Sequence, residues 1–432
     1  MPDRTLSRRA FAALGAAPFL RPRAGAAETE RKRVAVLVSE YRPSSHADVV
    51  CGRLLEGYWY EGREHHPALQ VVSMYTDQVP DEDMSRDLAA KHGFKLLPSI
   101  RHALTLTSDY STGPRRLAVD GVVVICEHGA YPYNPQGQKL YPRYEFFKQV
   151  VDVFRETGQT APVFTDKHLS YDWLKARWMY DQARQLNFPL MAGSVLPLAR
   201  DPARTVPPGT PLDKAVLAWE ATFFDSKDSY GFHALERLQS LVERRQGGET
   251  GIAAVQCLEG PPVWEWTQAN PWAERLLNAL GPKMRGSGFA DSVEDPMLFR
   301  LEYRSGLEAA ILRLNGCRTA AGFAALRPAN PEPLVLEDER TSPAVAVPEE
   351  HRRRYMHNIF SAEVRLIEQM IVTGKEPQPV ERTLLTTGAL AALFDSSYQP
   401  SAQYGRTMQH GTRLKRGRRV ETPHLAIPYT PA

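Results

Sequence analysis

Short apolar runs alternate with amphipathic stretches along the first half of the chain. The runs are rich in β-branched residues and four to seven residues long, which is typical of buried strands. They cover residues 33–38, 69–75, 121–126, 162–165 and 189–192. Between them apolar residues recur at helical spacing, as Phe147, Val151 and Phe154 do. The alternation predicts a doubly wound, Rossmann-like parallel sheet over residues 33–198.

The pattern changes in the second half. A proline-rich stretch over 200–211 separates the halves, and the apolar runs after it are longer and alternate with polar residues. They cover residues 251–258, 297–303, 307–314, 320–326 and 333–337. Such alternation predicts an open, mostly antiparallel sheet with one covered face. With helices expected over 361–373 and 382–395, the second domain, 212–432, is predicted to be α+β.

The N-terminus carries a separate signal. Ser-Arg-Arg-x-Phe at residues 7–11 is the core of a twin-arginine export signal, and an Ala- and Gly-rich segment leads to small residues at 24–26. We therefore expect residues 1–26 to be removed and the twin-arginine export machinery to be a partner. The mature chain would be periplasmic or secreted, and it would be exported in the folded state.

The overall charge follows from that signal. The chain of 432 residues has 53 Lys and Arg against 50 Asp and Glu, a net charge of +3. Five Arg and one Asp lie in residues 1–26, so 48 basic and 49 acidic residues remain without them. The basic excess therefore gives no reason to expect a nucleic-acid partner. No apolar run nears the roughly 20 residues of a spanning helix, so no membrane span is predicted.

Four cysteines stand far apart in the sequence. They are Cys51, Cys126, Cys257 and Cys317, and no C-x-x-C pair occurs. Neither a zinc knuckle nor a thioredoxin-type site is indicated, and we expect the thiols to be buried. A disulfide in an oxidising compartment stays open, because spacing alone does not decide it.

Five short motifs follow one another across roughly 350 residues. They are RVAVLV at 33–38 with His46-Ala47 downstream, VDGVV at 119–123, PVFTDK at 162–167, GFH at 231–233 and IVTGKEP at 371–377. In this order they resemble the Gfo/Idh/MocA family, the relatives of glucose-fructose oxidoreductase and inositol dehydrogenase. The resemblance implies an oxidoreductase that acts on a sugar, cyclitol or glycoside with NAD or NADP. In relatives the second sheet commonly serves as an interface, so a homo-oligomer is among the implied partners.

The same resemblance assigns catalytic roles. Lys167 takes the position of the family's catalytic lysine, at the end of a parallel strand where such sheets place ligands. His233 matches a second polar residue, which faces the substrate from domain two as acid or base. His168 stands where the family has proline and adds an imidazole.

A distinctive loop over residues 127–144 leaves the strongest predicted strand and should lie over the ligand crevice. Its side chains offer the stacking faces and directional hydrogen bonds that carbohydrate hydroxyls need. The alternative is a structural lid packed by its own tyrosines. The predicted substrate-binding residues are Glu127, His128, Tyr131, Asn134, Arg143 and His168.

The family's glycine-rich cofactor loop is absent. Where G-x-G-x-x-G should follow the first strand, the sequence reads VSEYRP at 38–43. Glu40 would repel phosphate, and Pro43 lacks an N–H donor. The weak candidates that remain for cofactor binding are Ser39, Arg42 and Asp77.

Two functions besides the oxidoreductase stay open. One is a non-catalytic carbohydrate-binding protein that kept the crevice. The other is a metal-dependent lyase or hydrolase, since imidazole and carboxylate ligands suit zinc or manganese. No two of the candidate ligands have a recognised metal-binding spacing; they are Glu127, His128, Asp166, His168 and His233.

Overall fold

The structure is a computed structural model. It describes residues 31–107, 116–197, 205–219, 226–281, 289–316, 322–328, 330–337, 359–400 and 411–431. The predicted export signal at 1–26 and Cys317 lie outside the described residues. All contacts reported below lie within the unit of the fold that starts at Arg31.

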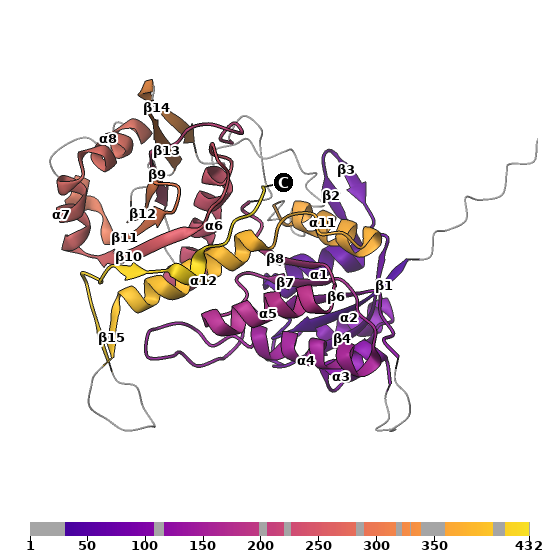
Figure 1. Cartoon of the computed structure of the whole chain (residues 1–432). Helices are drawn as coiled ribbons and strands as arrows, with labels where there is room; N and C mark the ends of the chain where they lie inside the picture. The colour runs from indigo at the N-terminus through magenta and orange to yellow at the C-terminus, as the bar shows by residue number, and fades with distance from the viewer. Residues whose placement is uncertain are drawn as a thin grey trace, which may run out of the picture. The chain divides into compact units, whose positions relative to one another are not determined.

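A six-stranded parallel sheet occupies the first half, in the order β5-β4-β1-β6-β7-β8 (Figure 1). The strands are β1 (Lys32–Val38), β4 (Leu69–Thr76), β5 (Lys95–Leu96), β6 (Gly121–Ile125), β7 (Val163–Asp166) and β8 (Leu190–Gly193). The strand order reverses between β1 and β6, because β1 pairs with β4 on one side and with β6 on the other. The predicted doubly wound parallel sheet is confirmed.

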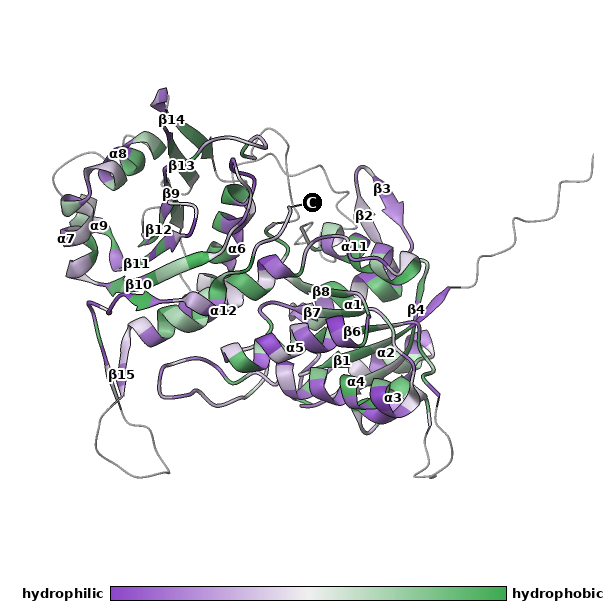
Figure 2. Ribbon diagram, in the orientation of Figure 1, coloured by the Kyte–Doolittle hydropathy of each residue, from purple (hydrophilic) through white to green (hydrophobic). Residues whose placement is uncertain are grey.

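Helices cover both faces of this sheet. They are α1 (His46–Glu56), α2 (Ser85–His92), α3 (Ile100–Thr105), α4 (Arg143–Thr157), α5 (Trp173–Gln185) and α11 (Ile359–Thr373). Alternate strand residues face opposite sides. Leu37 and Val124 pack with α3, α4 and α5, whereas Val36 and Val123 pack with α1 and α11. In Figure 2 the strands are mostly green, and α4 and α5 carry purple stripes, as helices with one buried face should.

The second half contains a seven-stranded sheet, in the order β14-β13-β9-β12-β11-β10-β17. The strands are β9 (Lys214–Trp219), β10 (Ile252–Glu259), β11 (Glu294–Tyr303), β12 (Glu308–Asn315), β13 (Gly322–Arg327), β14 (Asn330–Glu337) and β17 (Val420–Glu421). Strands β9 and β12 pair in parallel, and the other described neighbours are antiparallel. The predicted α+β domain with a mostly antiparallel sheet is confirmed.

Both faces of this second sheet are covered, whereas the sequence pattern predicts one covered face. Helices α6 (Gly231–Val242) and α12 (Glu381–Ser396) pack on one face, and α7 (Pro261–Ala269) and α8 (Pro271–Leu280) pack on the other. The prediction of one covered face is wrong because that other face also carries large apolar side chains. Val216, Leu298 and Leu312 are buried there against Trp266 and Leu276.

Several short elements complete the described chain. They are the hairpin β2 (Tyr58–Tyr60) and β3 (Arg63–His65), a π-helix (Ser226–Tyr230), α9 (Phe289–Ser292), the hairpin β15 (Tyr398–Pro400) and β16 (Gly411–Arg413), and a 3-10 turn (Pro423–Leu425). None of the helices in the described ranges combines the length and the apolar character that crossing a bilayer requires.

Candidate functional site

Buried polar residues follow the carboxyl ends of three neighbouring strands in the parallel sheet. Glu127 comes after β6, Asp166 ends β7 with Lys167 and His168 directly behind it, and Ser194 follows β8. Each of the five is at most 6% exposed. Parallel strands end together at one sheet edge, where folds of this kind bind ligands. These residues therefore define the candidate site.

Lys167 leaves its strand in a left-handed backbone conformation. Its φ is 65°, which is uncommon for a residue with a side chain. Its backbone is held by Gly193, with Lys167 N donating to Gly193 O at 2.9 Å and Gly193 N donating back at 3.1 Å. The buried Lys167 Nζ contacts His233 Nε2 and lies 3.4 Å from Glu127 Oε1. The structure thus brings together the two residues predicted to be catalytic.

His233 reaches this lysine from the first turn of α6, which begins at Gly231. Burial and the nearby charge of Lys167 hold the pKa of His233 well below its ordinary value. A neutral imidazole can accept the N–H of Lys167 at Nε2. Its Nδ1 has no hydrogen-bond partner among the described residues.

A buried chain of charged side chains extends the site. Arg143 Nη2 donates to Glu127 Oε2 at 2.6 Å, and Arg143 Nη1 lies 3.1 Å from His168 Nε2. His168 Nε2 in turn lies 3.3 Å from Asp228 Oδ1, on the π-helix before α6. Burial opposes ionisation of Glu127, but Lys167 and Arg143 outweigh it and lower its pKa. Glu127 is therefore an anion held between two cations.

His46 forms a second pair at the same edge. Its Nδ1 lies 2.6 Å from Asp166 Oδ2, and its ring meets the Phe360 ring edge-on at 5.2 Å between centroids. The His46 backbone N–H donates to His128 Nδ1 at 3.4 Å. Burial raises the pKa of Asp166, but the charge and hydrogen bond of His46 outweigh burial and lower it. These contacts join the start of α1 to the loops after β6 and β7, across the point where the strand order reverses.

The loop between β1 and α1 does not fit the pyrophosphate of NAD or NADP. Such a group needs backbone N–H donors, close approach and no nearby negative charge. Here the carboxylate of Glu40, 8% exposed, pairs with Arg42 Nε at 2.6 Å. Ser45 caps α1 by accepting a hydrogen bond from Asp48 N at 3.2 Å. At the start of α1, the N–H of Asp48 is thus already bonded to a side chain of the same chain.

The other predicted cofactor residues also bond within the chain. Ser39 N donates to Ile125 O at 3.0 Å, which ties the loop to β6. The carboxylate of Asp77 accepts hydrogen bonds from the hydroxyls of Tyr75 and Tyr131, at 2.8 and 2.7 Å. These contacts give both residues a structural role.

The predicted substrate-binding residues separate into two groups. Glu127, Arg143 and His168 join the Lys167 cluster as described, and His128 lies beside His46 with its pKa lowered to about 4 by burial and by His46. Tyr131 bonds to Asp77 instead, and Asn134 forms a local turn in which its Oδ1 accepts from Gln138 N at 2.9 Å. For Tyr131 and Asn134 the described contacts agree with the alternative of a self-packed lid.

Sequence reasoning missed several members of this site. His46 entered only as part of a strand-and-helix motif, and Asp166 only as part of the PVFTDK motif and as a candidate metal ligand. Asp228 and Glu236 were not singled out, although both flank the Gly-Phe-His motif and could have been found as acids near His233. Glu363 lies on α11, far along the chain, and no local signal marks it.

Metal ligation finds no support in the described ranges. Within them, no group of three or more His, Cys, Asp or Glu side chains is placed to hold a metal ion. The described cysteines, Cys51, Cys126 and Cys257, are free buried thiols, as expected from the sequence. The metal-dependent alternative therefore has no ligand set among the residues described.

Glu236 is a buried acid next to the site. It is 1% exposed, and its Oε2 accepts from Ser194 N at 2.7 Å while its Oε1 lies 3.2 Å from Thr383 Oγ1. Burial raises its pKa from 4.5 to about 7. A Cβ at Gly193 would lie 2.6 Å from Glu236 Oε1, so glycine is required there.

Replacing Glu236 with Gln should remove a pH-dependent loss of stability. The folded chain holds the Glu236 proton more tightly than the unfolded chain. The stability that this proton gives the wild type is therefore fully present below pH 4.5 and is lost as pH rises through about 7. Over that window E236Q should gain about 3 kcal/mol in unfolding free energy relative to wild type, measured in urea. If the difference in unfolding free energy between E236Q and wild type stays constant with pH, this prediction is contradicted. Glu274→Gln, on the exposed side of α8, is the matched control.

No protein-family model and no curated protein sequence matches this chain. Solved structures do. Myo-inositol dehydrogenase from Lactobacillus casei, in complex with NAD(H) and myo-inositol, has a TM-score of 0.52 at 12% identity, over 84% of this chain and 93% of that chain. GenD2 from gentamicin A biosynthesis, in complex with NAD, has a TM-score of 0.50 at 16% identity, over 87% and 97%.

A myo-inositol dehydrogenase from Corynebacterium glutamicum is similar to the same degree. Its TM-score is 0.50 at 13% identity, over 85% of this chain and 96% of that chain. At such identities the likeness concerns the fold, and it extends over nearly the whole length of each neighbour. The chain therefore shares with these solved proteins a fold in which a parallel, Rossmann-like sheet is followed by a mostly antiparallel sheet with helices.

Proposed function

We propose that this chain is an oxidoreductase of the type whose fold it shares, acting on a hydroxyl group of a sugar, cyclitol or glycoside. The observation that carries the proposal is the direct contact of Lys167 Nζ with His233 Nε2, beside Glu127, at the carboxyl edge of the parallel sheet. A lysine and a neutral histidine in contact form a pair that can move a proton. The dehydrogenase solved with myo-inositol makes cyclitols the first class to test.

The proton steps follow from the chain's own groups. A lysine ammonium has three N–H donors, and the contacts with His233 and Glu127 account for two of them. The third can donate to the oxygen of a substrate hydroxyl. As that hydroxyl loses its proton, the ammonium stabilises the negative charge that develops on the oxygen. The proton leaves by a relay: Lys167 passes the proton of its contact to Nε2 of neutral His233 and takes up the proton that the hydroxyl loses.

Nicotinamide is the hydride acceptor that the resemblance implies. The β1–α1 loop does not fit its pyrophosphate, so the chemistry that the described residues support is the transfer of the proton. The same loop favours a second candidate function, which is carbohydrate binding without catalysis. In that case the Lys167 cluster would serve only as a hydrogen-bonding surface for hydroxyl groups.

One set of measurements separates these functions. Purified chain is denatured and the released small molecules are identified by mass spectrometry, and native chain is titrated calorimetrically with myo-inositol, D-glucose and a methyl glucoside. Turnover is then followed by nicotinamide absorbance with NAD or NADP added. Oxidation of a polyol supports the oxidoreductase, and binding without turnover supports the second candidate. Neither binding nor turnover would overturn both.

A further inference from the structure

Glu363 on α11 is a fully buried acid. Its exposure is 0%, and neither carboxyl oxygen has a hydrogen-bond partner in the described part of the chain. The same helix buries Val364 and Ile367 in the core of the parallel sheet, which fixes the helix that carries Glu363. A buried carboxyl without a partner is rare in native proteins and calls for a specific explanation.

The charged groups that act on Glu363 come from three other elements. They are Asp166 at the end of β7, Lys167 directly after it, Glu236 on α6 and Arg53 on α1. Burial and the two acids outweigh the two cations and raise the pKa of Glu363 well above its ordinary value. A neutral carboxyl avoids the cost of burying an unpaired charge. It also carries an O–H group that can donate a hydrogen bond.

Further polar atoms at these strand ends lack partners as well. Asp166 Oδ1 and Ser194 Oγ are buried, and neither has a hydrogen-bond partner among the described residues. They come from the ends of β7 and β8, next to Lys167. Together with Glu363 they provide donors and acceptors in the mixture that a molecule with several hydroxyl groups can satisfy.

We propose that Glu363 is a further binding residue of this site, whose buried carboxyl group forms a hydrogen bond with a hydroxyl group of the ligand. Asp166 Oδ1 and Ser194 Oγ serve neighbouring hydroxyls. The ligand is an uncharged polyhydroxylated molecule, because the carboxylate of Asp166 would repel a sugar acid or a sugar phosphate. The identification of a polyol as the ligand rests on the proposed function.

Two substitutions and one control test this assignment. Glu363→Gln keeps a donor of the same size, and Glu363→Met keeps the length but removes the donor. In calorimetric titration with myo-inositol at pH 7, E363Q should stay within about threefold of wild type, whereas E363M should bind about tenfold more weakly or worse. Gln369→Met, exposed on the same helix, should bind as wild type does. Thermal unfolding confirms that each variant is folded.

An infrared measurement tests the protonation state without any ligand. At pH 7 the wild-type spectrum should contain the carbonyl bands of protonated carboxylic acids, and E363Q should lose the part of that intensity that Glu363 contributes, while the part from Glu236 remains. A band unchanged in E363Q, or myo-inositol binding unchanged in E363M, would overturn the assignment of Glu363 alone. Wild type that binds none of the polyols would overturn the proposed function and the ligand class named here together, even where the band is present.

Discussion

Replacing Lys167 with Met should abolish turnover of the polyol and leave the fold intact. The side chain is 4% exposed, and its Nζ contacts His233 and lies 3.4 Å from Glu127. Methionine fills nearly the same space but offers no N–H to a substrate oxygen. Without the ammonium, the charge that develops on that oxygen is uncompensated, and a loss of about a thousandfold in kcat/KM is expected.

The fold should tolerate this change because Glu127 keeps Arg143, whose Nη2 donates to it at 2.6 Å. The melting temperature should therefore move by only a few degrees. Lys175→Met is the matched control, since Lys175 pairs with Glu145 on the helix surface, at 2.6 Å, away from the described contacts of Lys167. A K167M variant with wild-type turnover would remove Lys167 from the mechanism.

Replacing Arg382 with Met should destabilise the chain by about 3–5 kcal/mol. Arg382 on α12 is 1% exposed, and it donates through Nη2 and Nε to the two carboxyl oxygens of Glu243, at 2.6 and 2.8 Å. Tyr429 near the C-terminus donates its hydroxyl to the same carboxylate at 2.7 Å. Without the guanidinium, Glu243 would stay buried as an uncompensated charge.

The free energy of unfolding in urea measures this effect. The double variant R382M with Glu243→Gln should recover part of the loss, because it no longer buries a charge without its counterion. Arg184→Met is the control. Arg184 forms a similar fork with Glu376 but is 37% exposed, so its loss should cost less than about 1 kcal/mol. If R382M and R184M lose the same unfolding free energy, burial does not explain the contribution of Arg382.

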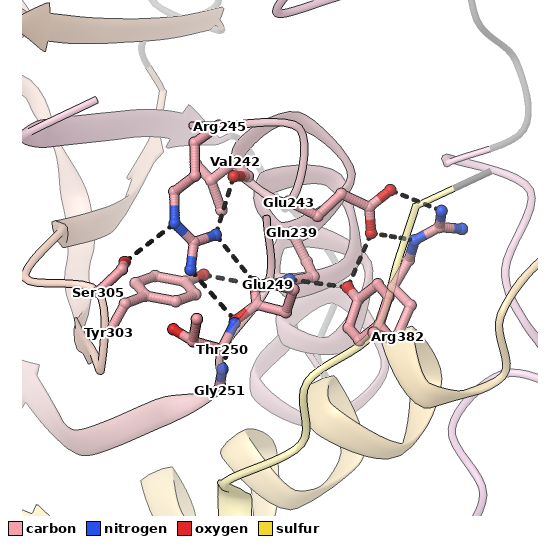
Figure 3. Close-up of polar contacts among 11 residues, drawn as sticks. Gln239, Val242, Glu243, Arg245, Glu249, Thr250, Gly251, Tyr303, Ser305 and Arg382 are labelled. Atoms are coloured by element: carbon pink, nitrogen blue, oxygen red, sulfur yellow. Dashed lines mark hydrogen bonds and ion pairs between the residues drawn. The ribbon is translucent and has the colours of Figure 1, made fainter. Parts of the chain in front are cut away.

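A second buried ion pair lies in the same network. Arg245 and Glu249 are 2% and 0% exposed at their side chains, with Arg245 Nη1 donating to Glu249 Oε2 at 2.9 Å. Arg245 Nε also donates to Ser305 at 3.0 Å (Figure 3). Glu249 Oε1 accepts a hydrogen bond from Gly251 N at 2.6 Å, directly before β10 begins. The network thus fixes the turn between α6 and β10.

The parallel sheet could be predicted because its strands are short, apolar and separated by helical periodicity. Strand β9 (Lys214–Trp219) was not predicted, since the proline-rich stretch before it indicated a linker and its six residues give no alternation. It is nevertheless a central strand, paired with β12 and β13. Its apolar run fits burial on both faces, a pattern that does not separate strands from short helices.

The candidate site was predictable only in part, because some of its residues are brought in by tertiary packing and carry no local sequence signal. Lys167 and His233 each lie in a motif whose order along the chain carries information. Glu236 and Glu363 enter the site through packing of α6 and α11, and their neighbours in sequence indicate nothing about the carboxyls they meet. Their unusual environment arises from tertiary contacts, which periodicity does not encode.

The placement of α11 affects the order in which the chain can fold during synthesis. Val36, Val123 and Phe164 share one buried cluster with Val364 and Ile367, so the sheet of the first half is partly covered by residues made much later. A nascent chain that ends before Ile359 lacks the α11 residues of this cluster, so the apolar strand residues that α11 covers stay exposed. The first half therefore cannot complete its core alone, and its final packing waits for the last quarter of the sequence.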